Sequence, residues 1–201
     1  MNVSAVMWSP LVSIAVWVTL LPLLAFHFVL SKRINSFAGP YIAFAHSWES
    51  CPSDKTLELL FRPSHFSRSR PYDLQTISGN ISFKGEITDN TLTEADLAIW
   101  SNNQWKENAF IFRIPRTGCS VIRDDIPDFF RILTKYNGAR KDPCVVPAAH
   151  SVLKNEPVNW TFPHFPIMPY GRYRFQYRAR KTREGPAILC VSVDCEVIPK
   201  P

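Results

Sequence analysis

The alternation of side chains between residues 172 and 180 constrains the fold more than any other stretch of the chain. One parity is aromatic or small: Tyr173, Phe175, Tyr177 and Ala179. Successive side chains of a β-strand point to opposite faces of a sheet, so this pattern predicts a half-buried strand with an aromatic inner face. The other parity places a row of guanidinium groups on the outer face: Arg172, Arg174, Arg178 and Arg180.

A second alternating run follows after a turn cluster at 182–186. Its apolar parity is formed by Leu189, Val191, Val193, Cys195 and Val197. Two strands with matched apolar faces and a short turn between them predict an antiparallel hairpin. We interpret it as the closing hairpin of a β-sandwich. An alternating aromatic strand is usually plain core, so the function has to be sought elsewhere in the chain.

Further periodic segments predict an all-β domain with one short helix. We expect two short strands within 41–62 and further strands at 73–87, 91–100 and 105–114. Residues 145–159 show no period in their apolar side chains and are predicted to be irregular. Pro127 suits the first position of a helix, and Gly138 lies just past its expected end. Phe129, Phe130 and Leu133 would share one side of that helix.

The first 30 residues are almost wholly apolar, and no Lys or Arg precedes Lys32. Two interpretations remain open. The segment is a signal peptide, cleaved after Val29-x-Ser31 or Ser36-x-Ala38, or it is a retained anchor long enough to span a bilayer. We therefore divide the chain into a targeting segment, 1–38, and one domain, 39–201, which is an ordinary size for a domain.

Cysteines and glycosylation motifs support export. All five cysteines follow the apolar segment, so two disulfides can form and one thiol is left over. Asn80-Ile-Ser82 and Asn159-Trp-Thr161 match the N-glycosylation acceptor. Together these features predict a secreted, extracellular glycoprotein. The formal net charge of +6 favours anionic partners such as lipid headgroups, and export argues against nucleic acid as a partner.

The sequence shows none of the motifs of a catalytic or metal site that we searched for. It has no H-E-x-x-H and no G-x-S-x-G. The histidines lack metal-ligand spacing: His27, His46, His65, His150 and His164. Asp124 and Asp125 form an acidic pair just before the expected helix, where carboxylates interact favourably with the helix dipole. We predict no enzymatic activity, no cofactor and no metal.

Several motifs occur in the order found in one family. They are Trp48-x-x-Cys51, Gly118-Cys119, Phe129-Phe130, Asp142-Pro143-Cys144, Pro163-x-x-Pro166, Gly171-Arg172-Tyr173-Arg174 and Leu189-Cys190. Over 44–198 the chain resembles the ML lipid-recognition superfamily, in particular its ganglioside-activator-like branch and the insect secreted chemosensory members. The resemblance implies a two-sheet antiparallel β-sandwich or β-cup with an internal hydrophobic cavity that takes up lipid tails, and no catalytic residue.

The resemblance also implies a disulfide pattern. Cys51 would pair with Cys190, and Cys119 with Cys144 around the helical insert. Closing a loop of about 25 residues stabilises a fold by roughly 3 kcal/mol in the chain-entropy picture. Ganglioside activators carry more cysteines around the insert. In this chain the rim of the cavity is therefore expected to be held by fewer disulfides. Cys195 has no family partner and is expected to be a buried free thiol that packs as a small apolar residue.

Two sets of site residues follow from this resemblance and from the strand parity. The cavity lining is expected to comprise Phe83, Phe110, Phe112, Phe129, Phe130, Tyr173, Phe175 and Tyr177. An apolar pocket binds tails by burying area, at roughly 25 cal/mol per Å². The row of Arg172, Arg174, Arg178 and Arg180 is expected to dock an anionic membrane surface or a receptor, the alternative being an ordinary solvated face.

The expected function is that of a secreted binding protein that holds a lipid or hydrophobic pheromone-like ligand, with chemosensation as its setting. Two alternatives remain at this stage. The first is a lipid-presenting accessory protein for a glycolipid hydrolase or an immune receptor. The second is a membrane-anchored adhesion or receptor-partner domain with a solid core and no ligand. The presence or absence of a cavity separates the second alternative from the others.

Overall fold

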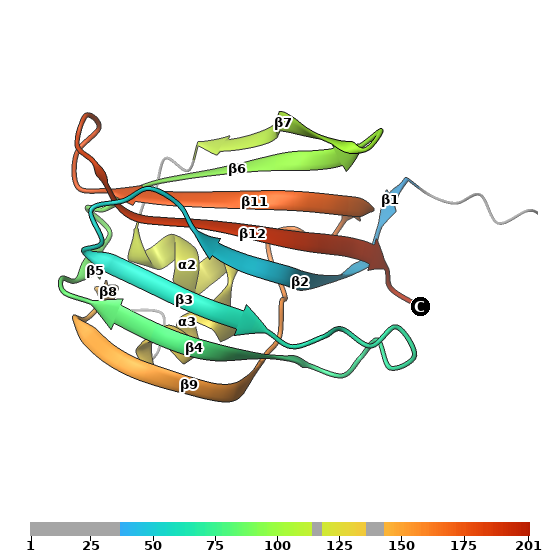
Figure 1. Cartoon of the computed structure of the whole chain (residues 1–201), viewed down its shortest axis with the longest axis horizontal. Helices are drawn as coiled ribbons and strands as arrows, with labels where there is room; N and C mark the ends of the chain where they lie inside the picture. Colours follow the sequence, from blue (N-terminus) through green and yellow to red (C-terminus); the bar gives the residue numbers. More distant parts are fainter. Residues whose placement is uncertain (1–36, 114–117, 136–142) are drawn as a thin grey trace, which may run out of the picture. The chain divides into compact units, whose positions relative to one another are not determined.

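The computed structural model describes residues 37–113, 118–135 and 143–201. They belong to one compact unit, Phe37–Pro201. Its antiparallel sheets are arranged as a sandwich, which confirms the all-β prediction (Figure 1). The N-terminal apolar segment, with both interpretations of it, lies outside the described residues. Within the described ranges, no helix is long and apolar enough to cross a membrane.

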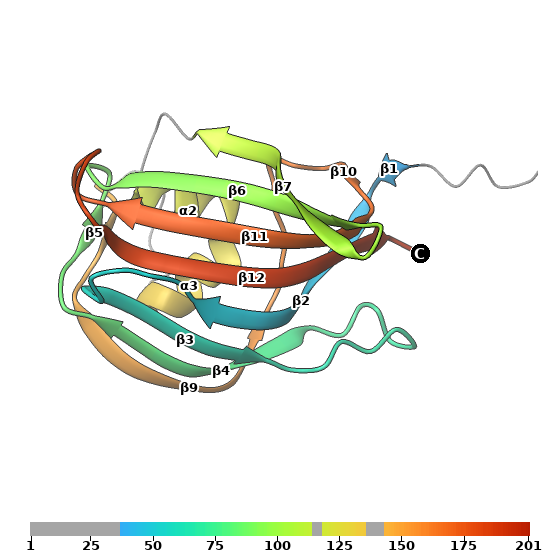
Figure 2. The same ribbon diagram turned by 45° about the horizontal axis from the view of Figure 1, so that its top comes forward.

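The larger sheet has five strands. In spatial order they are β2 (Tyr41–Ser50), β12 (Ala187–Pro199), β11 (Gly171–Arg180), β6 (Leu92–Ser101) and β7 (Gln104–Arg113). The expected closing hairpin is β11–β12, with Phe175 opposite Val193 and Tyr177 opposite Val191. This hairpin lies at the centre of the sheet rather than at its edge (Figure 2).

The smaller sheet has three strands, β3 (Leu57–Pro63), β4 (Gln75–Phe83) and β9 (Ala149–Val158). The prediction of irregular structure at 145–159 was wrong, because β9 occupies most of it. As an edge strand, β9 buries only Leu153 and Val158. Its pairing with β4 is also interrupted near Gly79, and Asn155 has a positive φ. These features break the period that marks a strand in the sequence.

Two short strand pairs hold the connecting segments. β1 (Ala38–Gly39) pairs with β10 (Met168–Pro169), and β5 (Ile87–Thr88) pairs with β8 (Val145–Val146). The first pair fixes the chain just before β11. The β5–β8 pair holds the segment that follows the helices against the sandwich.

The described residues form two helices where one was expected. They are α2 (Cys119–Asp125) and α3 (Pro127–Thr134). α3 begins at the expected proline and buries Phe129, Phe130 and Leu133. The helix ends earlier than expected, because Lys135, in a left-handed conformation, forms its C-cap; Gly138 lies outside the described residues. Both views show the helices between the two sheets, behind β2 and β3 as seen in Figure 1 (Figures 1 and 2).

The shorter helix corrects the interpretation of the acidic pair. Asp124 and Asp125 precede α3, as expected, but they also end α2, where the helix dipole disfavours negative charge. Arg123 Nε donates to Asp124 Oδ1 at 3.1 Å, and His164 Nδ1 lies 2.7 Å from Asp125 Oδ1. Arg123 therefore offsets the unfavourable position of Asp124, and Asp125 has a hydrogen-bond partner in His164.

The sandwich is closed along β2 and β3 by buried polar contacts. Gln75, only 5% exposed, donates from Nε2 to the carbonyl oxygens of Ala45 and Ser64, each at 2.7 Å. Its Oε1 accepts from Ala45 N and Trp160 Nε1, each at 3.0 Å. A buried amide with all its groups bonded is stabilising. It ties β4 to β2 across the two sheets.

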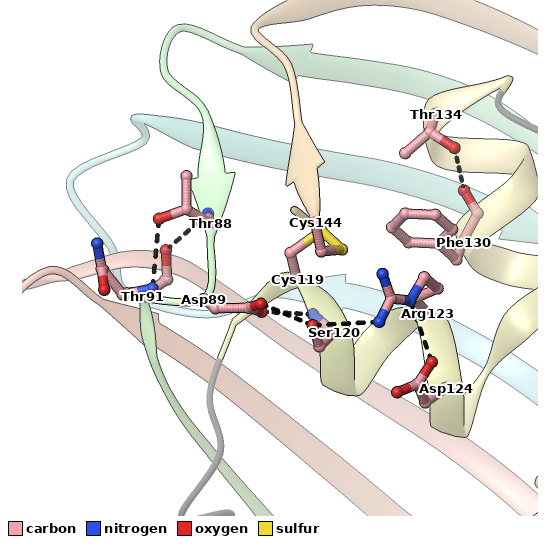
Figure 3. Close-up of a disulfide and its surroundings, with 11 residues drawn as sticks. Thr88, Asp89, Thr91, Cys119, Ser120, Arg123, Asp124, Phe130, Thr134 and Cys144 are labelled. Atoms are coloured by element: carbon pink, nitrogen blue, oxygen red, sulfur yellow. Dashed lines mark hydrogen bonds and ion pairs between the residues drawn. A yellow bond between two sulfur atoms is a disulfide. The ribbon is translucent and has the colours of Figure 1, made fainter. Parts of the chain in front are cut away.

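Both expected disulfides are present. Cys51 pairs with Cys190 across 139 residues, and Cys119 pairs with Cys144 across 25 (Figure 3). Next to the second bridge, the backbone and hydroxyl of Ser120 both donate to Asp89, each at 2.7 Å. The start of α2 is thereby fixed to the turn between β5 and β6.

Candidate functional site

An apolar cavity of about 230 Å³ lies inside the sandwich. The larger sheet forms most of its wall, with Ala43, Phe44, Ala45, Trp48, Ala95, Leu97, Tyr173, Phe175, Tyr177, Leu189, Val191, Val193, Cys195 and Val197. The opposite wall comes from β3, β4, β5 and the helices, with Leu59, Phe83, Ile87, Val121, Ile122, Asp125, Ile126, Phe129 and Leu133. The cavity therefore lies between the two sheets, where strand parity places the apolar side chains.

A loop completes the wall at one end. We call residues 159–167, which join β9 to β10, the rim strap. Trp160, Phe162 and Phe165 of the strap line the cavity together with Met168 of β10. Phe165 is 37% exposed and Ile167 62% exposed, so the strap lies between the cavity and solvent. It marks the mouth of the cavity.

Five of the eight residues expected to line a cavity do so. They are Phe83, Phe129, Tyr173, Phe175 and Tyr177. Phe130 is buried in the core around α3 but is not part of the wall. Phe110 is 40% exposed, because β7 is an edge strand of the larger sheet; its ring centroid lies 6.4 Å from that of Tyr173. The side chain of Phe112 lies outside the described ones; its backbone pairs with Ala95.

The sequence pattern does not indicate several of the residues that line the cavity. Trp48 was noted only as part of a motif, although its ring lies 5.7 Å from that of Phe129. Trp160, Phe162 and Phe165 belong to a proline-interrupted segment without a period, so no face could be assigned to them. The only feature of this segment that could have indicated a role in the cavity wall is its high density of aromatic side chains beside prolines.

Three polar groups of the aromatic wall residues are hydrogen-bonded to the protein itself, whereas the enclosed hydroxyl of Tyr177 has no such partner among the described residues. Trp48 Nε1 donates to the Leu59 carbonyl at 3.1 Å, and Trp160 Nε1 donates to Gln75 as described above. Tyr173 Oη donates to the Pro169 carbonyl at 2.9 Å. Burial raises the pKa of Tyr173, so this hydroxyl stays protonated at neutral pH. The cavity surface is left almost purely apolar.

Cys195 is the free cysteine, as expected, but it is half-buried rather than fully buried, because its side chain borders the cavity. Burial raises its pKa to about 12, and the neighbouring charge of Asp194 acts in the same direction. The thiolate, not the thiol, is the nucleophile and the metal ligand. At neutral pH Cys195 therefore lines the cavity as an uncharged, polarizable side chain rather than as a reactive group.

Polar contacts hold the rim strap over the mouth. Within the described part of the wall, Asp125 is the charged residue. His164 Nδ1 in the strap lies 2.7 Å from Asp125 Oδ1, at hydrogen-bond distance. Tyr41 Oη donates to the Phe165 carbonyl at 2.8 Å, and burial raises the pKa of Tyr41 to about 12. Both contacts connect the strap to the body of the sandwich.

The arginine row does lie on the outer face of β11, but acidic groups offset much of its charge. Arg172 and Arg174 pair with Asp194 and Glu107, and Arg178 Nη1 donates to Asp96 at 3.0 Å. Its fourth member, Arg180, donates to the Gly185 carbonyl at 3.1 Å. These contacts link β11 to β12 and β6 and, beyond β6, to β7. The expected docking role remains a prediction.

No protein-family model matches the chain, and no curated protein matches it. In the part of the chain that the structure describes, no group of three or more His, Cys, Asp or Glu side chains is placed to hold a metal ion.

Proposed function

We propose that this protein is a non-catalytic binding protein that holds a lipid or another hydrophobic small molecule between its two sheets. The observation that carries the proposal is the cavity of about 230 Å³ with an almost wholly apolar wall. An apolar cavity of about 150 Å³ is already enough to bind benzene. An alkyl chain in this space would gain about 0.8 kcal/mol per buried methylene before ordering costs.

The cavity also gives a reason for an occupant to bind. Protein interiors are normally packed as densely as organic crystals. A void of 230 Å³ would cost on the order of 5 kcal/mol if it stayed empty, at about 24 cal/mol per Å³. A hydrophobic guest restores the missing contacts. A domain with a solid core, the adhesion alternative, would not leave such a space.

The setting of the proposal comes from the sequence. The apolar N-terminal segment, the glycosylation motifs and two disulfides favour a secreted protein. The resemblance to the ML superfamily favours a pheromone-like ligand and a chemosensory role. The accessory role for a glycolipid hydrolase or immune receptor uses the same cavity and is the second candidate.

Binding of N-phenyl-1-naphthylamine, a probe that fluoresces in apolar sites, tests the proposal with two matched variants. Val193 lines the cavity, whereas Val152 is 59% exposed on β9. Val193→Phe places a bulky ring in the cavity and is expected to weaken probe binding at least tenfold with the fold intact. Val152→Phe is expected to bind as the unaltered protein does. Equal binding by both variants, or no binding by the unaltered protein, would contradict the proposal.

A further inference from the structure

We propose that an N-linked glycan on Asn80 forms part of the folded surface, with its first sugar covering apolar side chains on the outer face of the smaller sheet. We call Leu60 on β3 and Val152 on β9, which lie on either side of Asn80 on β4, the apolar row. The glycan lies outside the cavity, so its role is separate from the proposed ligand binding and shares with it only the export of the protein.

The register of the smaller sheet places Asn80 at the centre of this face. β4 is the middle strand, between β3 and β9 (Figure 1). Asn80 is exposed, whereas the next residue, Ile81, is 0% exposed and belongs to the core. Asn80 pairs with Leu60 on one side and with Val152 on the other. Because directly opposed side chains have Cβ atoms about 4.5–5.5 Å apart, a sugar on Asn80 begins between two apolar side chains.

The apolar side chains of this face are confined to the row that holds Asn80. Leu60 is 49% exposed and Val152 is 59% exposed. One exposed apolar side chain is ordinary on a protein surface, but here the two flank the acceptor asparagine that lies within the sheet. The adjacent paired positions on the outer face are polar: Glu58, Ser82 and His150 in one direction, and Arg62 and Ser78 in the other.

The chemistry of an N-glycan suits this surface. The amide nitrogen of Asn80 loses a proton and bonds to C1 of N-acetylglucosamine, while the lipid diphosphate donor of the secretory pathway leaves. The sugar ring presents C–H groups on its faces and hydroxyl groups at its edge. Contact of a ring face with Leu60 and Val152 removes apolar surface from water, which is stabilising. Neighbouring strands are about 4.8 Å apart, so the ring and its acetamido group together span the row.

A double-mutant cycle tests the proposal. Ser82→Ala abolishes the acceptor motif without altering Asn80, and the secreted variant is expected to melt about 2–4 °C lower by circular dichroism. In a protein that also carries Leu60→Thr and Val152→Thr, the same change should lower the melting temperature by about half of that or less, because the apolar row is gone.

Thr161→Ala is the matched control. It removes the sugar from Asn159, which follows β9 and lies outside the smaller sheet. Its effect on the melting temperature should be the same in the presence and in the absence of the apolar row.

Enzymatic trimming gives a second measurement if Ser82→Ala is not secreted. The Thr161→Ala protein, produced with high-mannose glycans, carries sugar on Asn80 and not on Asn159. Endoglycosidase H leaves the first sugar on Asn80, so the melting temperature should be nearly unchanged. Peptide N-glycosidase F removes that sugar and leaves Asp, so the melting temperature should fall. Equal melting temperatures after the two treatments would contradict the proposal.

Three further results would overturn it. They are an unmodified Asn80 in glycopeptide mass spectrometry of the secreted protein, an equal effect of Ser82→Ala in both backgrounds, and a glycosylated dimer that dissociates on Leu60→Thr. The dimer would show that a second copy of the chain covers the row instead. Uptake of N-phenyl-1-naphthylamine by the same samples reports the cavity separately, so each of these results would leave the proposed function standing.

Discussion

Cys195 connects sequence parity, packing and chemistry in a single side chain. It shares the inner face of β12 with Val191, Val193 and Val197, so it was expected inside the sandwich, and it lines the cavity there. Its burial keeps the thiol neutral, since its pKa rises to about 12. A free cysteine in a chain with two disulfides is thereby kept from exchanging with them.

We predict that Cys195 is unreactive in the folded protein. Labelling by a charged disulfide reagent at pH 8 should be at least about 100-fold slower than after unfolding in guanidinium, because reaction needs the thiolate. The other four cysteines are paired, so any signal from the unreduced protein reports Cys195. Rapid labelling of the native state would show that the thiol is not enclosed.

The same burial predicts a loss of stability in alkali. An unfolded thiol ionises near pH 8.5, whereas the folded thiol holds its proton to about pH 12. Between these values the unfolded state binds fewer protons, so the free energy of unfolding falls as pH rises from about 8.5. Denaturant unfolding at pH 8 and pH 10 should show a smaller fall for Cys195→Ala. The fall should not vanish, because the raised pKa values of Tyr41, Tyr173 and Tyr177 act in the same direction.

Gly118 is a second residue with a specific role. Its φ is +77°, and a Cβ there would lie 1.8 Å from the carbonyl oxygen of Thr88. Gly118→Ala should destabilise the fold by at least about 2 kcal/mol through strain and the clash. Gly85→Ala is the matched control, because its Cβ would meet only a Thr56 methyl carbon at 3.7 Å. Similar denaturation midpoints for the two variants would show that the turn before α2 can move freely.

At the scale of the element, the rim strap is the segment that separates the cavity from solvent. It has no regular secondary structure of its own between β9 and β10. The Asp125–His164 contact and the Tyr41 hydrogen bond hold it to the body of the domain. Its exposure and its few polar contacts make it the part of the wall that can open with the least loss of packing.

We predict that Asp125→Ala speeds ligand release. A partly exposed hydrogen bond contributes about 0.5–1 kcal/mol, so release of N-phenyl-1-naphthylamine should become roughly two- to fivefold faster. Stopped-flow dilution measures this rate directly. Asp124→Ala is the control, because Asp124 pairs with Arg123 on its own helix and not with the strap. An unchanged rate for Asp125→Ala, or an equal change in both variants, would mean that this contact does not hold the strap.

The elements also show what the sequence could and could not predict. Strand parity placed Tyr173, Phe175 and Tyr177 correctly, because β11 and β12 pair in one register over the cavity. Parity could not distinguish Phe129, which lines the cavity, from Phe130, which packs in solid core. A periodic pattern identifies the buried face of an element, but it does not show what lies opposite that face.

Two elements were missed for physical reasons. α2 has only seven residues and is separated from α3 by Ile126, so no helical period develops. β9 is an edge strand with few buried side chains and a break in its pairing. The rim strap has no period at all, which is why its aromatic contribution to the cavity was not foreseen.

At the scale of the whole domain, the described residues form a sandwich that closes on one side and is held apart by helices on the other. Gln75, Trp48 and the Cys51–Cys190 bridge join the elements at the β2 side. The helices are fixed by the Cys119–Cys144 bridge and by the start of α2. The cavity persists because these fixed contacts prevent the sheets from approaching each other.

Native mass spectrometry of the protein, purified from a secreting host with its disulfides intact, shows directly whether the cavity between the sheets is occupied. We expect a mass above that of the protein with its covalent modifications, and release of a lipid or hydrocarbon from this species on collisional activation. The Val193→Phe variant should carry less of it. A mass with no bound molecule, together with no uptake of N-phenyl-1-naphthylamine by the same sample, would contradict the claim that the space between the sheets holds a guest.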